Sequence, residues 1–315
     1  MTTDEGNENG TGDGNGVREA FLLLTHEIRL EILLALLEDW EAVYTEPKSY
    51  AELMDAVGMR DSGRFNYHLD KLRGVYVREV EDGYVPTASV TALYRTVLAH
   101  RPTERREFES SEIESACPRC EAALVLCYER GFATVDCPAC EEWDGFTYPF
   151  PKNGLEERDA DAIARTVARR ARRDIGLARA GQCPFCAGAT TVVLRLEALE
   201  SDNDGGSDGN SDAGDAEIAD RGRDPWVEIT CDDCTFLAGV RPMTALLTDA
   251  RAAGALADAG FDLERYDWEL PAPTVRVESR EPTRIALEVD GDEGNGSVTA
   301  VVDDAFAVRS VTVGS

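Results

Sequence analysis

The sequence contains 315 residues, with 61 acidic and 32 basic side chains and a formal net charge of -29. This length exceeds the usual size of one domain, so we expect two or three compact units rather than a single small fold. Hydrophobic residues make up 43% of the chain, which supplies enough apolar surface for buried cores and excludes a wholly disordered protein.

The N-terminal segment 1–16 contains four acidic residues, five glycines and no basic residue, the opposite of a secretory or transit peptide. We predict that it is a disordered acidic tail. The apolar stretch 21–37 is interrupted by charged side chains and is too short and too polar to span a membrane. A cytoplasmic protein without a membrane segment is therefore expected.

Segment 17–100 is predicted to be largely helical, and its first part, before Gly74, contains three helices. Thr25 is a suitable cap for a first helix, and Ser49 begins a second, shorter helix. A third helix begins near Asp61 or Ser62. From Gly74 onward apolar residues alternate with polar ones, and an Asp-Gly turn follows, which predicts a β-hairpin. Helix, helix, turn, helix and hairpin is the order of a winged helix-turn-helix.

The third helix has one apolar face, because Phe65, Leu69 and Leu72 fall at i, i+4 and i+7. Arginine can form two hydrogen bonds with guanine, asparagine can do the same with adenine, and hydroxyl groups bind phosphates. The alternative is a solvated helix face that contacts no ligand. We interpret His68 as a packing residue. The polar side of this helix carries Arg64, Asn66, Tyr67 and Lys71.

Segment 62–72 and the hairpin at 74–87 together resemble the ArsR-like winged-helix transcription regulators, over residues 17–100. The resemblance implies that the third helix lies in the major groove of DNA and that the DNA-contacting residues are Ser62, Gly63, Arg64, Asn66 and Tyr67, to which we add Lys71 of the same polar side. Metal-sensing members of that family bind their inducer through cysteines of the helical domain. Residues 1–116 contain no cysteine, so derepression by metal at such a site is not expected.

Charge argues both ways about DNA binding. Segment 58–86 holds five basic and five acidic residues, and Glu81 and Asp82 lie at the hairpin tip. The acidic excess of the whole chain is typical of a halophilic cytosol, although an acidic interaction surface is the alternative. At about 1 M salt the Debye length is about 3 Å, so the net charge does not exclude nucleic acid as a partner.

Residues 101–116 are predicted to be a charged linker, and four Cys-x2-Cys pairs follow it. In a cytosolic protein such pairs indicate metal binding before disulfides, because thiols stay reduced there. Only Cys127 of the nine cysteines lies outside the pairs, and we interpret it as a small buried apolar residue. The eight candidate ligands are Cys117, Cys120, Cys137, Cys140, Cys183, Cys186, Cys231 and Cys234.

The first two pairs are sixteen residues apart and flank a predicted hairpin, which is typical of a zinc ribbon at 117–150. The last two pairs are forty-four residues apart, but removal of the low-complexity segment 200–223 leaves twenty. We therefore predict a second ribbon at 183–240 with a disordered insert. The alternatives are one mixed site or redox-active pairs. Four thiolates leave no open position, so both zinc ions are expected to be structural.

Segment 155–180 is predicted to be an Arg-rich helix between the ribbons. Its apolar face carries Ile163, Val167, Ala171 and Ile175, and the opposite face carries Arg165, Arg169 and Arg172. These arginines would either follow a phosphate backbone or pair with acidic side chains of the same chain.

Residues 244–315 are predicted to form a helix at about 244–259 and then a small β-meander. Together with segment 262–270 and the modules before it, this part resembles a group of predicted transcription regulators from halophilic archaea. That broader resemblance implies no ligand.

The fold class is thus α+β and multidomain: a winged helix-turn-helix, two four-cysteine zinc ribbons joined by a basic helix, and a C-terminal module. Motifs of nucleotide-binding, metalloprotease and serine-hydrolase sites are missing, so no enzyme is expected. The main hypothesis is a sequence-specific, double-stranded-DNA-binding transcription regulator, dimeric through the helix at 88–100. One alternative is a general transcription factor or polymerase-associated scaffold, since a winged helix followed by a zinc ribbon resembles the archaeal TFE-type initiation factor. Another is a protein-interaction module.

Overall fold

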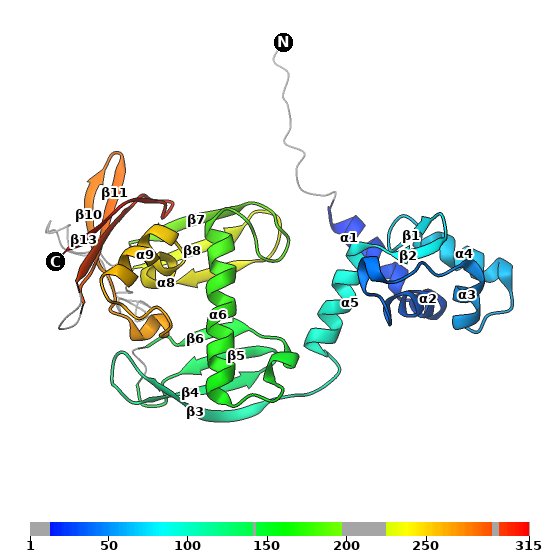
Figure 1. Cartoon of the computed structure of the whole chain (residues 1–315), viewed down its shortest axis with the longest axis horizontal. Helices are drawn as coiled ribbons and strands as arrows, with labels where there is room; N and C mark the ends of the chain where they lie inside the picture. The colour runs from blue at the N-terminus through cyan, green and yellow to red at the C-terminus, as the bar shows by residue number, and fades with distance from the viewer. Residues whose placement is uncertain (1–12, 141–142, 197–224, 292–295, 315) are drawn as a thin grey trace, which may run out of the picture. The chain divides into compact units, whose positions relative to one another are not determined.

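The computed structural model describes residues 13–140, 143–196, 225–291 and 296–314 (Figure 1). Within them the protein is a mixed α+β structure with eight α-helices and four sheets. The insert predicted at 200–223 lies outside the described residues, as do residues 1–12 of the predicted tail.

The predicted tail ends earlier than expected, because residues 13–16 belong to helix α1 (Asp13–Leu24). The apolar residues Ala20, Leu23 and Leu24 of α1 are partly buried against the neighbouring core. This packing stabilises α1 although its first turn is rich in glycine. Composition alone did not indicate a helix here.

The chain divides into two compact units, with the boundary between Arg105 and Arg106. We call them the N-terminal unit and the C-terminal unit. The N-terminal unit contains α1, α2 (Glu27–Leu37), the 3-10 helix η1 (Ala42–Tyr44), α3 (Tyr50–Ala56), α4 (Ser62–Leu72), the antiparallel pair β1 (Val77–Val80) and β2 (Gly83–Pro86), and α5 (Ala88–His100).

Helices α2, α3 and α4 of the N-terminal unit each begin at a residue whose side chain accepts a backbone hydrogen bond. Ser49 and Glu52 form a reciprocal capping box at α3, and Asp61 accepts a hydrogen bond from the backbone of Arg64 at α4. The prediction that Thr25 caps α2 is wrong. The Thr25 hydroxyl donates to the Leu22 carbonyl of α1, and His26 is the cap of α2 instead.

The core of the N-terminal unit forms where α2, α3 and α4 meet. Leu69 and Leu72 of α4 are fully buried, as the periodicity predicted. Phe65 is also buried, and the Tyr50 ring packs edge-on against it at 5.0 Å between centroids. The buried face of α4 therefore leaves its opposite side free for solvent or a ligand.

The described part of the C-terminal unit contains three antiparallel sheets and five helical segments. The strands are β3 (Phe108–Ala116), β4 (Ala123–Glu129), β5 (Phe132–Asp136), β6 (Phe146–Pro149), β7 (Thr190–Arg195), β8 (Trp226–Cys231), β9 (Leu237–Val240), β10 (Thr274–Arg280), β11 (Thr283–Val289), β12 (Ser297–Val302) and β13 (Val308–Gly314). The helical segments are η2 (Lys152–Leu155), α6 (Ala160–Arg179), α8 (Pro242–Leu247), α9 (Ala250–Asp258) and η3 (Asp267–Glu269).

The linker predicted at 101–116 is partly wrong, because its second half forms β3, which pairs with β4. The linker was predicted from the charged residues of the segment, but two of its apolar residues pack against β4. Ile113 is buried, and the Phe108 ring stacks on Tyr128 at 6.0 Å between centroids. Long-range pairing with β4 thus outweighs the polar character of the segment.

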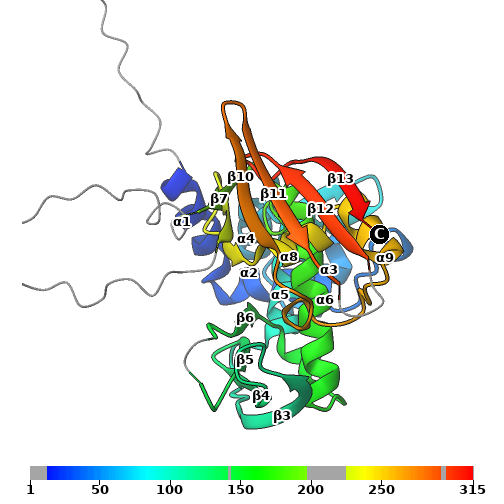
Figure 2. The same ribbon diagram turned by 90° about the vertical axis from the view of Figure 1, so that its left-hand side faces the viewer.

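Helix α6 is the common support of the C-terminal unit. It packs against β3 and β5 at one end and against β7 and α8 toward the other, and both views show it running between these sheets (Figure 1, Figure 2). Its predicted apolar face, Ile163, Val167, Ala171 and Ile175, is buried. The modules expected at 117–150, 155–180, 183–240 and 244–315 share one continuous hydrophobic cluster and one compact unit.

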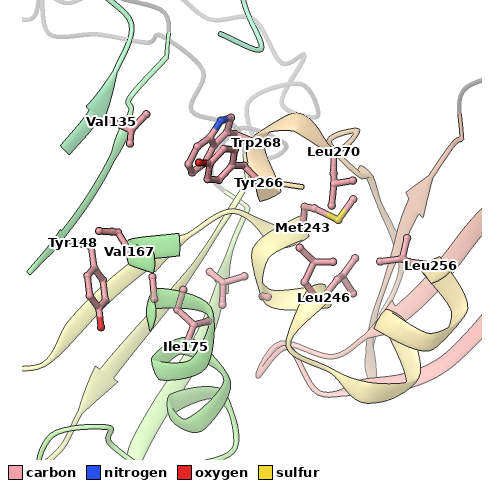
Figure 3. Close-up of a cluster of buried hydrophobic side chains, with 14 of the residues drawn as sticks. Val135, Tyr148, Val167, Ile175, Met243, Leu246, Leu256, Tyr266, Trp268 and Leu270 are labelled. Carbon is pink, nitrogen blue, oxygen red and sulfur yellow. The ribbon is translucent and has the colours of Figure 1, made fainter. Parts of the chain in front are cut away.

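The C-terminal segment forms the predicted meander, with strands in the order β10, β11, β12, β13. The single helix expected at about 244–259 is instead two helices, because Asp249 accepts hydrogen bonds from two backbone N–H groups and starts α9. Figure 3 shows Tyr266 and Trp268 lying against each other, with ring centroids 4.4 Å apart, near Met243 of α8. All three residues belong to the hydrophobic cluster of the C-terminal unit.

Arg179 at the end of α6 joins three parts of the C-terminal unit. Its guanidinium donates to Asp249 at 3.1 Å, to the Thr248 hydroxyl at 2.9 Å and to the Phe306 carbonyl at 3.0 Å, and its side chain is 11% exposed. Its removal leaves the largely buried Asp249 with Arg251, at 3.9 Å, as its remaining cation.

We expect Arg179→Ala to lower the free energy of unfolding by about 3 kcal/mol, because one partner of a buried ion pair is lost. The matched control is Arg169→Ala on the same helix, whose 74% exposed side chain meets Glu264 at 3.6 Å. This control should change the free energy by less than about 0.5 kcal/mol. Urea unfolding followed by tryptophan fluorescence measures both values, and equal effects would contradict the role of Arg179.

Candidate metal centres and an exposed helix face

The first cysteine cluster lies at one end of the sheet β3 to β6. Cys117 and Cys120 lie in the turn between β3 and β4, and Cys137 and Cys140 follow β5. The Sγ atoms of Cys117 and Cys140 are 3.7 Å apart, and those of Cys120 and Cys137 are 3.5 Å apart. All four sulfurs lie within 4.8 Å of one another.

The second cluster joins two pairs that are distant in the sequence. The sulfurs of Cys183 and Cys234 are 3.7 Å apart, and those of Cys186 and Cys231 are 3.5 Å apart. The antiparallel pairing of β7 with β8 brings the two pairs together. The predicted pairing across the insert is therefore confirmed, and a site mixed from both clusters is excluded by this grouping of the sulfurs.

The turns 117–122 and 183–188 have the same backbone geometry. In each, the N–H of the first cysteine donates to the carbonyl five residues later at 2.8 Å, and its carbonyl accepts from the residue four positions later, at 2.9 and 3.0 Å. That fourth residue has a left-handed φ in both turns, 63° at Glu121 and 62° at Ala187. The two clusters are thus built on a repeated turn, which the Cys-Pro-x-Cys letters alone do not specify.

Backbone N–H groups point at the sulfurs and favour thiolates. Burial opposes ionisation of Cys183, but the N–H groups of Cys186 and Phe185 outweigh it and lower the pKa of Cys183 to about 7. The Gly188 N–H favours the thiolate of Cys186, yet the neighbouring Cys231 thiol and burial outweigh it and raise the pKa of Cys186 to about 12. Adjacent thiols therefore hinder one another's ionisation, and a cation between them removes that hindrance.

The sulfur spacing fits a tetrahedral metal ion. Zinc binds thiolate sulfur at about 2.3 Å, which places tetrahedral ligands about 3.8 Å apart. A disulfide requires about 2.05 Å between sulfurs, so the observed separations of 3.5 to 3.7 Å exclude disulfides here. Both clusters could hold a metal ion, and four sulfurs leave no open coordination position.

Cys127 belongs to neither cluster. It lies on β4, is half-buried, and its Sγ is 3.6 Å from the Thr134 carbonyl of β5. Burial, followed by the charges of Asp136 and Glu129, raises the pKa of its thiol. It is less buried than its sequence context predicted, and it stays protonated at neutral pH.

The six residues predicted to contact DNA all lie at exposed positions of α4. Within the described residues the Arg64 guanidinium forms no ion pair. The Lys71 ammonium lies 5.8 Å from the centroid of the Tyr67 ring, which is 58% exposed. The full set of exposed positions is Ser62, Gly63, Arg64, Asn66, Tyr67 and Lys71.

An acidic neighbour restrains one of these residues, and the sequence analysis missed it. The Asn66 amide donates to Asp70 at 2.9 Å, one helical turn away. Asp70 in turn pairs with Arg73, which also pairs with Glu79 of β1. The i, i+4 spacing of Asn66 and Asp70 is the signal that could have revealed this contact.

Most arginines of α6 pair within the chain, which was one of the two interpretations of the basic face. Arg172 donates to the carbonyls of Leu263 and Arg265, and Arg169 pairs with Glu264. Arg173 pairs with the buried carboxylate of Asp174 on α6 itself. These contacts, with those of Arg179, leave Arg165 as an exposed arginine of the predicted face.

The comparisons with known proteins assign no activity. A family model described as "Domain of unknown function (DUF7351)" matches residues 114–308, and one described as "Domain of unknown function (DUF7347)" matches residues 17–97. No curated protein and no solved structure matches the chain. Within the described segments, no helix has both the length and the apolar character needed to cross a membrane.

Metal analysis tests both clusters. We expect about two equivalents of zinc in the purified chain, and about one in Cys120→Ser, because three thiolates hold the ion more weakly. Cys127→Ala is the matched control, since it removes a sulfur outside both clusters, and it should keep both ions. Plasma mass spectrometry gives the stoichiometry. A folded chain without metal would contradict the assignment.

Proposed function

The chain belongs to the DUF7351 family, and we propose from its own residues that it is a sequence-specific DNA-binding transcription regulator with structural zinc. The observation that carries the proposal is the exposed face of α4, where Arg64 forms no ion pair with any described residue. A cation without an internal partner is available for a phosphate or for the edge of guanine.

The order of elements in the N-terminal unit supports a winged helix-turn-helix. Helices α2, α3 and α4 share one core, and the hairpin of β1 and β2 follows α4 directly. In such a domain the exposed side of the third helix lies in the major groove, and the hairpin lies beside the DNA backbone. Glu81 and Asp82 at the hairpin turn disfavour close phosphate contact there, so we assign specificity to α4.

The two side chains best suited to read bases are not equally ready to do so. Arg64 needs no rearrangement within its own unit to reach a base pair. Asp70 already accepts from one of the two N–H donors of the Asn66 amide, so only the second donor and the amide oxygen remain for adenine. We therefore assign the larger share of specificity to Arg64.

The two clusters then act as zinc ribbons that hold the C-terminal unit together. Each ribbon packs its sheet on α6, and neither forms a separate core. Zinc at a closed four-thiolate site supplies folding free energy and no catalytic position. Val97 and Leu98 on α5 are 48% and 50% exposed, and we assign them to the contact between two copies of the chain.

A second candidate function is a protein-interaction module or polymerase-associated scaffold. Phe185 and Leu237, beside the second cluster, are 63% and 65% exposed. The corresponding position of the first cluster, Arg119, is charged, so the repeated turn itself does not require an aromatic residue. Co-purification with RNA polymerase, without any preferred DNA site, would favour this candidate.

DNA selection in molar potassium chloride tests the main proposal. Wild-type protein is expected to enrich a defined site, and Arg64→Ala is expected to lose about 1–3 kcal/mol of binding free energy for that site, because one base contact is removed. Binding to unrelated DNA should change much less. Fluorescence anisotropy with both DNAs measures the difference.

Arg18→Ala on α1 is the matched control, because it removes one exposed arginine of the same unit outside α4. It should leave site preference unchanged. If wild-type protein enriches no sequence, or if Arg64→Ala combined with Asn66→Ala binds with unaltered preference, α4 is not the reading helix.

A further inference from the structure

Four nitrogen-bearing side chains gather where α2 packs on α4. His26 caps α2, and Arg29 lies in the first turn of that helix. The rings of His26 and His68 have centroids 4.1 Å apart. Arg64 lies one helical turn before His68 on α4, and the Arg29 guanidinium also donates to the Leu22 carbonyl of α1 at 3.0 Å. We call these four side chains the His-Arg cluster.

Two nitrogens of the cluster are buried without a hydrogen-bond partner among the described residues. They are Nδ1 of His68, a residue that is 5% exposed, and Nε of Arg29. Buried polar atoms in native proteins have a partner in roughly 90% of cases or more. Arg29 Nε always carries a proton, so its partner must be an acceptor.

The surroundings of these nitrogens are positive. Burial, then His26 and Arg29 of α2, then Arg64 of α4, all lower the pKa of His68, and no carboxylate opposes them. The N-terminal end of α2, which carries a partial positive charge, begins at His26. The chain has 61 acidic and 32 basic residues, so a group of basic side chains with no carboxylate among the causes of the His68 pKa shift differs from the composition of the whole chain.

We propose that the His-Arg cluster is a binding site for a small inorganic anion. A water molecule would satisfy the two nitrogens, whereas an anion would accept the same hydrogen bonds and also be attracted by the neighbouring guanidinium groups. The close approach of the two rings and the burial of His68 select a compact ion such as chloride over a bulky one.

Proton and anion binding are then linked. Without the anion, the lowered pKa of His68 means that stability is lost as pH falls below about 6.5, because the unfolded chain binds the proton more readily. A bound anion favours the protonated ring, so it raises the pKa of His68 and reduces that loss. Each ligand thus strengthens the binding of the other.

The chain contains only three histidines, so the full-length protein labelled with carbon-13 at histidine Cε1 gives three signals. Chloride replaces the bulky gluconate ion at constant potassium concentration and constant ionic strength. We expect the His68 signal to shift saturably and its pKa to rise by about half a unit or more. The signal of His100, which lies outside the cluster, should not respond.

Arg29→Met should abolish the chloride response of His68. The matched control is Arg18→Met, which removes the same charge from an exposed position of α1 and should keep the response. If wild-type His68 gives the same shift and pKa in both salts, or if His100 responds equally, the proposal is overturned. The wild-type titration decides this outcome even if Arg29→Met does not fold, and it needs no DNA.

Discussion

Four cysteine sulfurs lie within 4.8 Å of one another in each cluster, a spacing at which four thiolates repel strongly unless a cation lies between them. In the C-terminal unit this constraint acts on the sheet β3 to β6 and on the sheet β7 to β9, whose connecting turns carry the cysteines. The repeated turns at 117–122 and 183–188 direct N–H groups toward the sulfurs and so prepare both clusters for an ion. Helix α6 then supplies the apolar surface that neither hairpin has alone.

In the N-terminal unit the important charges lie on the two sides of helix α4. The buried side of its α4 helix is apolar except for His68, and the polar side faces solvent or a ligand. Among the described residues Arg64 forms no ion pair, while Asn66 is held by Asp70. The same helix carries His68 on its buried side, beside positive charge from α2. Arg64 belongs both to the His-Arg cluster and to the residues that we assign to DNA, so an anion at this place would act on the same part of α4.

Charge distribution decides which arginines are free for a partner. Arg172 and Arg179 of α6 donate to carbonyls of distant segments, and Arg173 pairs with Asp174 beside it, so these arginines of the basic run stabilise the fold. Arg64 has no such contact within the described part of its own unit. The count of arginines per segment is thus a poor guide to nucleic-acid binding, and the partners of each guanidinium are a better one.

The sequence by itself determined the features that depend on neighbours along the chain. The Cys-x2-Cys pairs, the apolar face of α4 and the alternation that forms β10 to β13 are local patterns, and each was predicted correctly. The eight ligands could be named because spacing alone restricts where a tetrahedral site can form.

Only the tertiary structure decided the features that depend on contacts between distant segments. The strand β3 exists because Phe108 and Ile113 pack on β4, although their flanking residues are charged. The partners of Arg172 and Arg179 lie far along the chain, and the pairing of His26 with His68 requires α2 and α4 to meet. Such contacts are set by how elements pack, and no local periodicity encodes which side chains become neighbours.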